Sequence, residues 1–347
     1  MLTVVITAYN EEKYIFECLK SLEMQTFKDF EVIVVNDGST DKTLEIIEYF
    51  KKQSDLKLKI ISQENSGVAE ARNHALRFVN TKYLKFLDGD DFLEPNALEE
   101  MISMAEKYDL PIIKTSYKVV KNNRKINNSY NANFDKAGQI IDIAQNKDWL
   151  VLDNVGIGGK LYRTDCFDGI IFPSFDGDFV PEDLAITPYI HAKAGFVGVS
   201  ELNLVNYRRH TGSLTNAKAR KVCGYFIDGF KSFEYLKDLF KTNGLFDEYK
   251  EQLAKMSISY RTLDMLMLCF VNSTYTIKEK LDVLNILRAL ANEDLKEYNV
   301  GKEIYKNKNA FWWPVYVAFC KSLIGYNNED VDVNLLKEEA RKVLLRK

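Results

Sequence analysis

The sequence predicts an α/β protein in which a mostly parallel β-sheet is covered by helices and is followed by an α-helical C-terminal region. Apolar runs of strand length alternate with amphipathic helical segments through residues 2–88, which is the pattern of a parallel sheet. Several of these runs end in polar turns rich in acids and glycine. Beyond about residue 218 strand patterns give way to helical periodicity. We therefore expect one α/β domain over residues 1–217 and a helical region over residues 218–347.

The first four strands are expected where the apolar runs lie, at residues 2–8, 30–35, 58–61 and 83–88. Between them, Ile15, Cys18, Leu19 and Leu22 share one helical face, and further helices are expected around residues 44–50 and 67–79. Right-handed crossovers place the C-terminal ends of parallel strands on one side of a sheet. The loops at residues 9–11, 37–39 and 88–90 should therefore meet at one rim.

The stretch at residues 83–91 gives the strongest chemical signal. Apolar residues, with Lys85 as the one break, lead directly into Asp88, Gly89, Asp90 and Asp91. Unpaired charges are costly to bury, so these acids should lie at the mouth of the strand, where open α/β sheets bind ligands. Their hard oxygen atoms suit Mg²⁺ or Mn²⁺ shared with the phosphates of a ligand. The alternative is a strand followed by a helix, with Asp91 as its N-cap and Pro95 in its first turn.

The rest of the α/β domain is less regular. Strands are expected over residues 111–120 and 197–207, with a polar hairpin or loop at 121–136. Residues 156–162 are rich in glycine but lack the spacing of a phosphate-binding loop. We therefore expect a tight turn that enters a short strand. Helices are expected over residues 222–240, 246–270, 277–290 and 333–345.

Composition excludes several classes of protein. The net charge of −3 offers no basic field for nucleic acid. Five scattered cysteines form no CxxC pair, and neither a signal peptide nor a run of ~18 apolar residues is found, so we expect a cytoplasmic protein.

The aromatic segment at residues 312–316 is expected to pack in the core, with peripheral contact at the inner membrane face as the alternative. The C-terminal helices could also bind the acceptor or form a homo-oligomer.

Four motifs resemble those of family 2 glycosyltransferases, which have the nucleotide-sugar-binding GT-A fold. In order along the chain they are Val5-Ile6-Thr7-Ala8-Tyr9-Asn10-Glu11, Val34-Val35-Asn36-Asp37-Gly38-Ser39-Thr40-Asp41, Glu64-Asn65-Ser66-Gly67 with Ala71-Arg72-Asn73, and Phe86-Leu87-Asp88-Gly89-Asp90-Asp91. The last is the DxD element of that family. The resemblance covers roughly residues 1–215.

The resemblance implies a UDP-sugar donor and a Mn²⁺ or Mg²⁺ cofactor. Its nucleotide-binding residues would be Thr7, Ala8, Tyr9, Glu11, Asp37, Arg72, Asp88 and Gly89. Asp37 would accept a hydrogen bond from uracil, and Tyr9 would pack on the base. Glu11 would reach the ribose or help to fix Arg72. Asp90 would ligate the metal.

The resemblance also assigns the chemistry of transfer. Inverting glycosyl transfer is a direct displacement in which a carboxylate takes the proton of the acceptor hydroxyl, and Asp183 of the Glu182-Asp183 pair would be that base. Glu182 would support it or contact the acceptor. The segment at residues 208–215 resembles the closing motif of the family. There, His210 would bind metal or diphosphate, and Arg208, Arg209 and Ser213 would bind phosphate oxygens. His74 and His191 are expected to be packing residues.

The leading hypothesis is thus a metal-dependent inverting transferase that moves a hexosyl or N-acetylhexosaminyl group to a glycan or lipid-linked acceptor in surface-polysaccharide synthesis. One alternative is a sugar-nucleotide nucleotidyltransferase, although residues 8–12 lack the glycine and positive charge that its loop requires. A dehydrogenase would need a GxGxxG motif after the first strand. A non-catalytic nucleotide-sugar-binding subunit would not need Asp88, Asp90 and Asp183.

Overall fold

The structure is a computed structural model, and it describes residues 2–121, 124–130, 138–153, 155–174, 182–210, 222–257 and 297–298. The chain divides into two compact units, Met1–Asp176 with Pro181–Ala219, and Gly177–Val180 with Arg220–Lys347. The division lies two residues beyond the expected boundary at 217/218. The helices expected at 277–290 and 333–345, the aromatic segment at 312–316 and Ser213 lie outside the described residues.

A mixed sheet forms the first unit. Its strands are β1 (Leu2–Ala8), β2 (Phe30–Asp37), β3 (Leu58–Gln63), β4 (Tyr83–Asp88), β5 (Phe92–Leu93), β6 (Ile112–Lys121), β7 (Arg124–Tyr130), β8 (Ile140–Asp142), β9 (Lys160–Arg163) and β10 (Phe196–Arg209). The main order is β3-β2-β1-β4-β9-β6-β10-β5, with β7 beside β6 and β8 beside β10. The neighbours β3, β2, β1 and β4 are parallel, whereas β9 runs antiparallel to both β4 and β6. The predicted α/β class is confirmed. The sheet, expected to be mostly parallel, is mixed: β3, β2, β1 and β4 form a parallel half, and antiparallel pairs predominate in the remainder.

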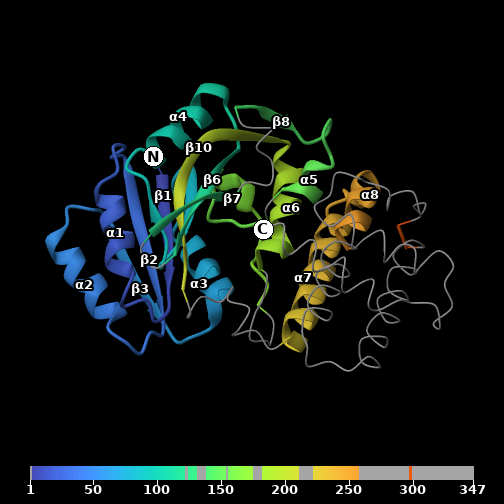
Figure 1. The fold of residues 1–347 in the computed structure, drawn as a ribbon. Coiled ribbons are helices and arrows are strands. Elements are labelled where there is room, and N and C mark those ends of the chain that lie inside the picture. The colour runs from blue at the N-terminus through green and yellow to red at the C-terminus, as the bar shows by residue number, and fades with distance from the viewer. Residues whose placement is uncertain are drawn as a thin grey trace. The chain divides into compact units, whose positions relative to one another are not determined.

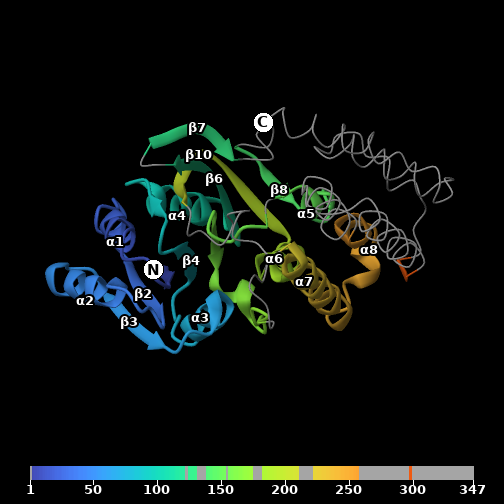
Figure 2. The ribbon, with the colours of Figure 1, turned by 60° about the horizontal axis from the view of Figure 1, so that its bottom comes forward.

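Helices cover both faces of the sheet. They are α1 (Ile15–Glu23), α2 (Thr43–Gln53), α3 (Gly67–Leu76), α4 (Ala97–Tyr108), α5 (Trp149–Leu152) and α6 (Glu182–Ala194). In Figures 1 and 2, α3 lies across the strands from α1 and α2. Alternate residues of the strands explain this arrangement. Val4, Ile6, Val32 and Val34 join one buried cluster with α1, α2 and α4, so the intervening residues face the α3 side.

Two expectations about local structure are resolved by the fold. Of the polar segment expected to be a hairpin or loop, residues 124–130 form β7, which pairs antiparallel with β6 as in a hairpin. The helix N-cap expected as an alternative at Asp91 is wrong. Asp91 is buried and accepts the backbone N–H of Arg208 at 2.8 Å, and α4 begins only at Ala97.

The second unit is described through two helices, α7 (Val222–Thr242) and α8 (Phe246–Met256). The rings of Phe240 and Tyr249 pack edge to face with their centroids 5.6 Å apart. The predicted helix at 222–240 is confirmed, and the one at 246–270 is confirmed as far as residue 256. Within the described part of the chain, no helix is both long and apolar enough to cross a bilayer.

Candidate active site

The three acidic and polar loops predicted to meet at one rim do so, and backbone groups join them. The Asn10 N–H donates to Ser39 Oγ at 3.1 Å, and the Thr40 N–H donates to Asn10 Oδ1 at 2.8 Å. The Gly89 N–H donates to Thr7 O at 3.0 Å. These bonds connect the ends of β1, β2 and β4, which are neighbours in the sheet. The rim is therefore a continuous surface built by parallel strands.

Asp37 fixes the turn before α3 with both of its carboxylate oxygens. Asp37 Oδ1 accepts from Gln63 Nε2 at 2.8 Å and from the Ser66 N–H at 2.9 Å, and Oδ2 accepts from the Gly67 N–H at 2.9 Å. Gly38 allows this close approach: its φ is +70°, and a Cβ there would lie 2.6 Å from the backbone nitrogen of Asn65. The predicted contact between Asp37 and uracil stays a prediction, which would use lone pairs left by these three donors.

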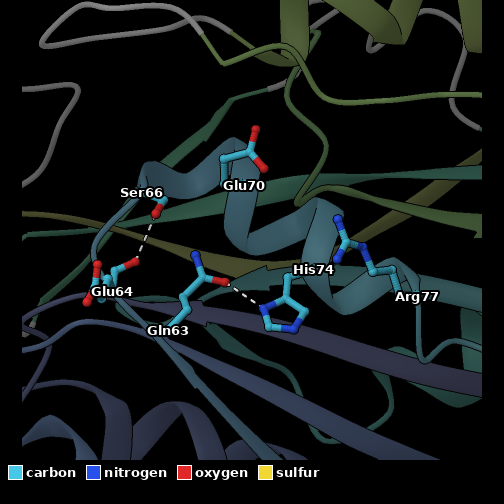
Figure 3. Close-up of a pocket in the computed structure, with 6 residues that line it drawn as sticks. All are labelled: Gln63, Glu64, Ser66, Glu70, His74 and Arg77. Atoms are coloured by element: carbon cyan, nitrogen blue, oxygen red, sulfur yellow. Dashed lines mark hydrogen bonds between the residues drawn. The ribbon is translucent and has the colours of Figure 1, made fainter.

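A small polar pocket of about 210 Å³ lies beside this turn (Figure 3). Its lining residues are Gln63, Glu64, Ser66, Glu70, His74 and Arg77. His74 Nδ1 lies 2.8 Å from Gln63 Oε1. Because the amide of Gln63 donates to Asp37, its oxygen must accept, so the Nδ1 of His74 bears the proton. His74, which the sequence assigned to packing, thus supports Gln63 and, through it, Asp37.

Glu11, Asp90 and His210 form the group most suited to a metal ion among the described residues. One ligand atom from each lies within 4.8 Å of the others, and His210 Nε2 lies 3.0 Å from Asp90 Oδ2. Glu11 Oε2 is buried without a hydrogen-bond partner. Burial, with the charges of Asp90 and Asp88, raises the pKa of Glu11 to about 8. A divalent cation would relieve this repulsion, and two carboxylates with an imidazole form a donor set that fits one.

Sequence reasoning placed Asp90 and His210 at the metal but assigned Glu11 to the nucleotide. In the structure Glu11 does not contact Arg72, whose acidic partners are Asp88, Glu182 and Asp183. The position of Glu11 in the loop after β1, at the same rim as the DxD element, was the signal that could have indicated a ligand role.

Arg208 holds the DxD turn in place from β10. It is 4% exposed. Its Nε–H donates to Asp90 O at 2.8 Å, and its guanidinium reaches Glu17 Oε2 at 2.6 Å. The predicted phosphate contact of Arg208 stays a prediction, whereas its contacts with the protein fix the backbone beside the metal group. Arg209 is exposed beside the ring of Tyr207.

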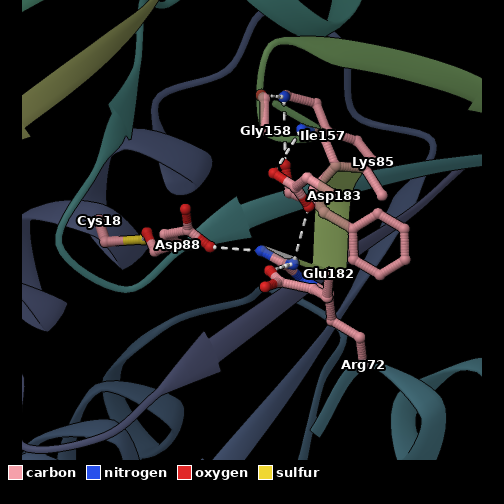
Figure 4. A network of polar contacts seen from close by, with 9 residues as sticks. Cys18, Arg72, Lys85, Asp88, Ile157, Gly158, Glu182 and Asp183 are labelled. Carbon is pink, nitrogen blue, oxygen red and sulfur yellow. Dashed lines mark hydrogen bonds and ion pairs between the residues drawn. The ribbon is translucent and has the colours of Figure 1, made fainter. Parts of the chain in front are cut away.

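Arg72 connects the DxD element to the Glu-Asp pair that begins α6 (Figure 4). The guanidinium is 3% exposed. It donates to Asp88 Oδ1 at 3.0 Å, to Asp183 Oδ1 at 3.1 Å, and to Glu182 Oε1. Burial, and to a lesser degree the negative charge of the neighbouring Asp183, raises the pKa of Glu182 to about 7. One buried cation thus positions carboxylates from β4 and α6.

Asp183 is held by hydrogen bonds at both of its carboxylate oxygens. Its Oδ1 accepts from Arg72, and its Oδ2 accepts from the Ile157 N–H at 3.1 Å. Each oxygen keeps lone-pair capacity for a further proton donor. Burial raises the pKa of Asp183 above its ordinary value, which strengthens it as a base. The link to the glycine-rich turn at residues 156–159 was not expected from the sequence.

Comparison with known proteins agrees with this geometry. Residues 3–168 match the model of glycosyl transferase family 2. EpsH of Bacillus subtilis, named as a glycosyltransferase, is 28% identical over 303 residues, which are 83% of each chain. The teichoic acid poly(glycerol phosphate) polymerase of Staphylococcus epidermidis is 46% identical over 98 residues, which are 28% of this chain and 14% of the polymerase.

Solved structures agree in fold. The crystal structure of S. aureus TarS 1-349 in complex with UDP-GlcNAc superposes with a TM-score of 0.65 at 19% identity, covering 100% of this chain and 92% of the TarS 1-349 chain. The likeness confirms the predicted GT-A fold, and the family match covers the strands and motifs that build the rim. Residues 3–168 of this chain therefore match a glycosyltransferase domain of family 2.

Proposed function

We propose that this glycosyltransferase is a metal-dependent, inverting enzyme that moves a sugar from a UDP-sugar to the hydroxyl of a glycan or lipid-linked acceptor. The observation that supports this most directly is the buried Arg72, which bonds to Asp88 and Asp183 at once. Asp88 would belong to the donor site because it is part of the DxD element, and Asp183 would be the catalytic base. Because Arg72 bonds to both residues, it would hold the donor site and the base at a fixed distance and orientation, as a single displacement requires.

The cofactor would be Mn²⁺ or Mg²⁺, held by Glu11, Asp90 and His210. The grouping of their ligand atoms within 4.8 Å supports this assignment. A bound divalent cation supplies charge that offsets the negative charge of a leaving diphosphate. The protein's own part is to keep Asp90 in place, which Arg208 does through the Asp90 carbonyl.

Asp183 would accept the proton of the acceptor hydroxyl. As that oxygen bonds to the anomeric carbon, the bond from the carbon to the UDP oxygen breaks on the opposite face, and the configuration inverts. Glu182, beside Asp183, would keep Arg72 in place or contact the acceptor. Tyr9, which is 47% exposed at the rim, would stack its ring on the uracil of the donor. The backbone of Thr7, Ala8 and Gly89 would lie beside the nucleotide.

The relatives indicate which substrates to test first. TarS was crystallised with UDP-GlcNAc, and a relative is named as a teichoic acid poly(glycerol phosphate) polymerase. We therefore infer an N-acetylhexosaminyl or hexosyl donor and an acceptor on a surface polymer, with the enzyme acting in the cytoplasm or at the inner membrane face. Residues 1–217 would bind the donor, and residues 218–347 would serve acceptor binding, self-association or membrane contact.

Release of UDP from a panel of UDP-sugars, starting with UDP-GlcNAc, tests this function. We expect one UDP-sugar to release UDP in the presence of Mn²⁺ or Mg²⁺, and chelation with EDTA to stop the release. A matched assay with UTP and a hexose 1-phosphate measures pyrophosphate. Pyrophosphate release without UDP release would favour the nucleotidyltransferase and contradict the proposal.

A further inference from the structure

Lys85 is a charged residue at a fully buried position of a core strand. It lies in β4 between Leu84 and Phe86 and has 0% exposure. Its side chain therefore cannot bring its ammonium group to solvent, as long cationic side chains usually do. Its Nζ donates instead to two backbone carbonyls, Gly158 O at 2.5 Å and Phe86 O at 3.3 Å. A buried cation is unfavourable unless such partners satisfy it, so these two hydrogen bonds fix the ammonium group, and the bond to Gly158 holds Lys85 against the backbone of the glycine-rich turn.

Lys160 is a second buried lysine that holds the same glycine-rich turn. It lies at the start of β9 and is 1% exposed. Its Nζ donates to Gly156 O at 2.8 Å and lies 3.3 Å from Asp153 Oδ2. From α6, Thr187 Oγ1 donates to Val155 O at 2.8 Å. Three carbonyls of residues 155–158 are thus bound by side chains from three different elements.

The carbonyl bound by Lys160 and the N–H bound by Asp183 belong to one peptide unit. Gly156 C=O and Ile157 N–H share a planar trans peptide, so fixing the direction of the oxygen also fixes the direction of the hydrogen. That hydrogen is donated to Asp183 Oδ2 at 3.1 Å. A cation at the carbonyl end also polarises the peptide and strengthens its N–H as a donor. Lys160 therefore acts on Asp183 across a single peptide group.

A buried network keeps Lys160 in place. Asp153 pairs with Lys114, which is 3% exposed, and lies 3.6 Å from His191 Nδ1. Although burial opposes it, the charges of Lys160 and Lys114 lower the pKa of Asp153 to about 2. Burial lowers the pKa of His191 to about 3. At neutral pH the network therefore holds two lysines, one carboxylate and a neutral imidazole.

We propose that Lys160, through the Gly156–Ile157 peptide, and Lys85, through the Gly158 carbonyl, are positioning residues that fix the Asp183 carboxylate for proton transfer. The inference rests on the proposed function, in which Asp183 is the base. Figure 4 shows Lys85 and Asp183 converging on the turn at Ile157 and Gly158, with Arg72 on the other side of Asp183. Neither lysine is expected to touch the substrate.

The test compares Lys160→Met and Lys85→Met in the UDP-release assay with UDP-GlcNAc, or with the panel member that releases UDP fastest. We expect kcat to fall by about 10- to 100-fold, the order of loss from displacing a reacting group by up to 1 Å. KM for the UDP-sugar and Kd for UDP with Mn²⁺ should stay within about twofold, because donor-binding residues are unchanged. Lys82→Met is the matched control: Lys82 is 49% exposed, pairs with Glu106 at the surface and lies over the ring of Tyr83, so it should behave nearly as wild type.

Combination with Asp183→Asn separates positioning from a general loss of structure. If the lysines act through Asp183, adding Lys160→Met to Asp183→Asn should lower kcat no further. An equal fall in both backgrounds, or a parallel loss of UDP binding, would overturn the inference. Should Lys160→Met fail to fold, Lys85→Met decides, because it leaves the Asp153 network intact. If Asp183→Asn alone keeps full activity, the proposed base is wrong; if it is inactive while both lysine variants have wild-type kcat, only this inference fails.

Discussion

Replacing Asp183 by asparagine is expected to lower kcat for sugar transfer by about 10²–10⁴-fold, the usual loss on removing a general base. The amide of asparagine is isosteric with the carboxylate, and its oxygen can still accept the Ile157 N–H that Asp183 accepts at 3.1 Å. It cannot take a proton at neutral pH. Since Asp183 bonds to Arg72 and is not one of the three residues of the metal group, UDP binding should change little. Steady-state kinetics and UDP titration measure the two effects separately.

Two companion variants make the Asp183 result specific. Asp165→Asn alters an exposed carboxylate that pairs with Arg163 at the surface, and it should leave kcat unchanged. Glu182→Gln removes the adjacent carboxylate. If Glu182→Gln lost as much kcat as predicted for Asp183→Asn while the latter stayed active, the base would be Glu182.

Removing the Arg72 guanidinium should cause the largest loss of stability at the site. Arg72→Met leaves Glu182 and Asp183, whose side chains are 10% and 24% exposed, without their cation. Breaking one side of a buried ion pair typically costs about 3–5 kcal/mol. Asp88 is 43% exposed and should add little, because water screens it. Urea unfolding measures the loss, and Arg77→Met, at an exposed position of the same segment, should stay within about 0.5 kcal/mol of wild type.

The loss on Arg72→Met should depend on pH. Burial already raises the pKa of Glu182 to about 7, and removing Arg72 raises it further because the arginine lowers it. A carboxyl group whose pKa is higher in the folded protein binds more protons there than in the unfolded chain, so folded-state stability falls as pH rises. The variant should therefore be closest to wild type near pH 5 and furthest from it near pH 8. A loss that is equal at both pH values would show that the missing charge is not its cause.

The rim of the site could be predicted from sequence because its cause is local. Apolar runs of strand length define β1, β2 and β4, and the acids after them stay at the strand ends, where even the buried Asp37 and Asp91 have hydrogen-bond donors. Parallel pairing then brings their C-terminal ends together, as the bond between Gly89 and Thr7 shows. Three of the four motifs that resemble the family end in the loops after those strands, and the third follows β3 and enters α3. Fold and family were therefore predicted from largely the same residues.

The connections behind the rim could not be predicted, because their partners are distant in sequence. Arg72 lies 110 residues from Glu182, and Lys85 lies 73 residues from Gly158. Periodicity treats Lys85 as a break in an apolar strand and gives no partner for its charge. The antiparallel β9, which brings Lys160 beside β4 and β6, is four residues long and has too short a pattern to fix its direction.

Calorimetric titration of UDP, with and without Mn²⁺, into the wild-type protein and Asp90→Ala tests the nucleotide–metal site most directly. Asp90 contributes one of the three ligand atoms that lie within 4.8 Å of one another. The account predicts that Mn²⁺ strengthens UDP binding to the wild-type protein at least about tenfold, the scale on which metal-site changes act, and that Asp90→Ala removes this gain. UDP binding that is the same with and without Mn²⁺, in both proteins, would contradict it.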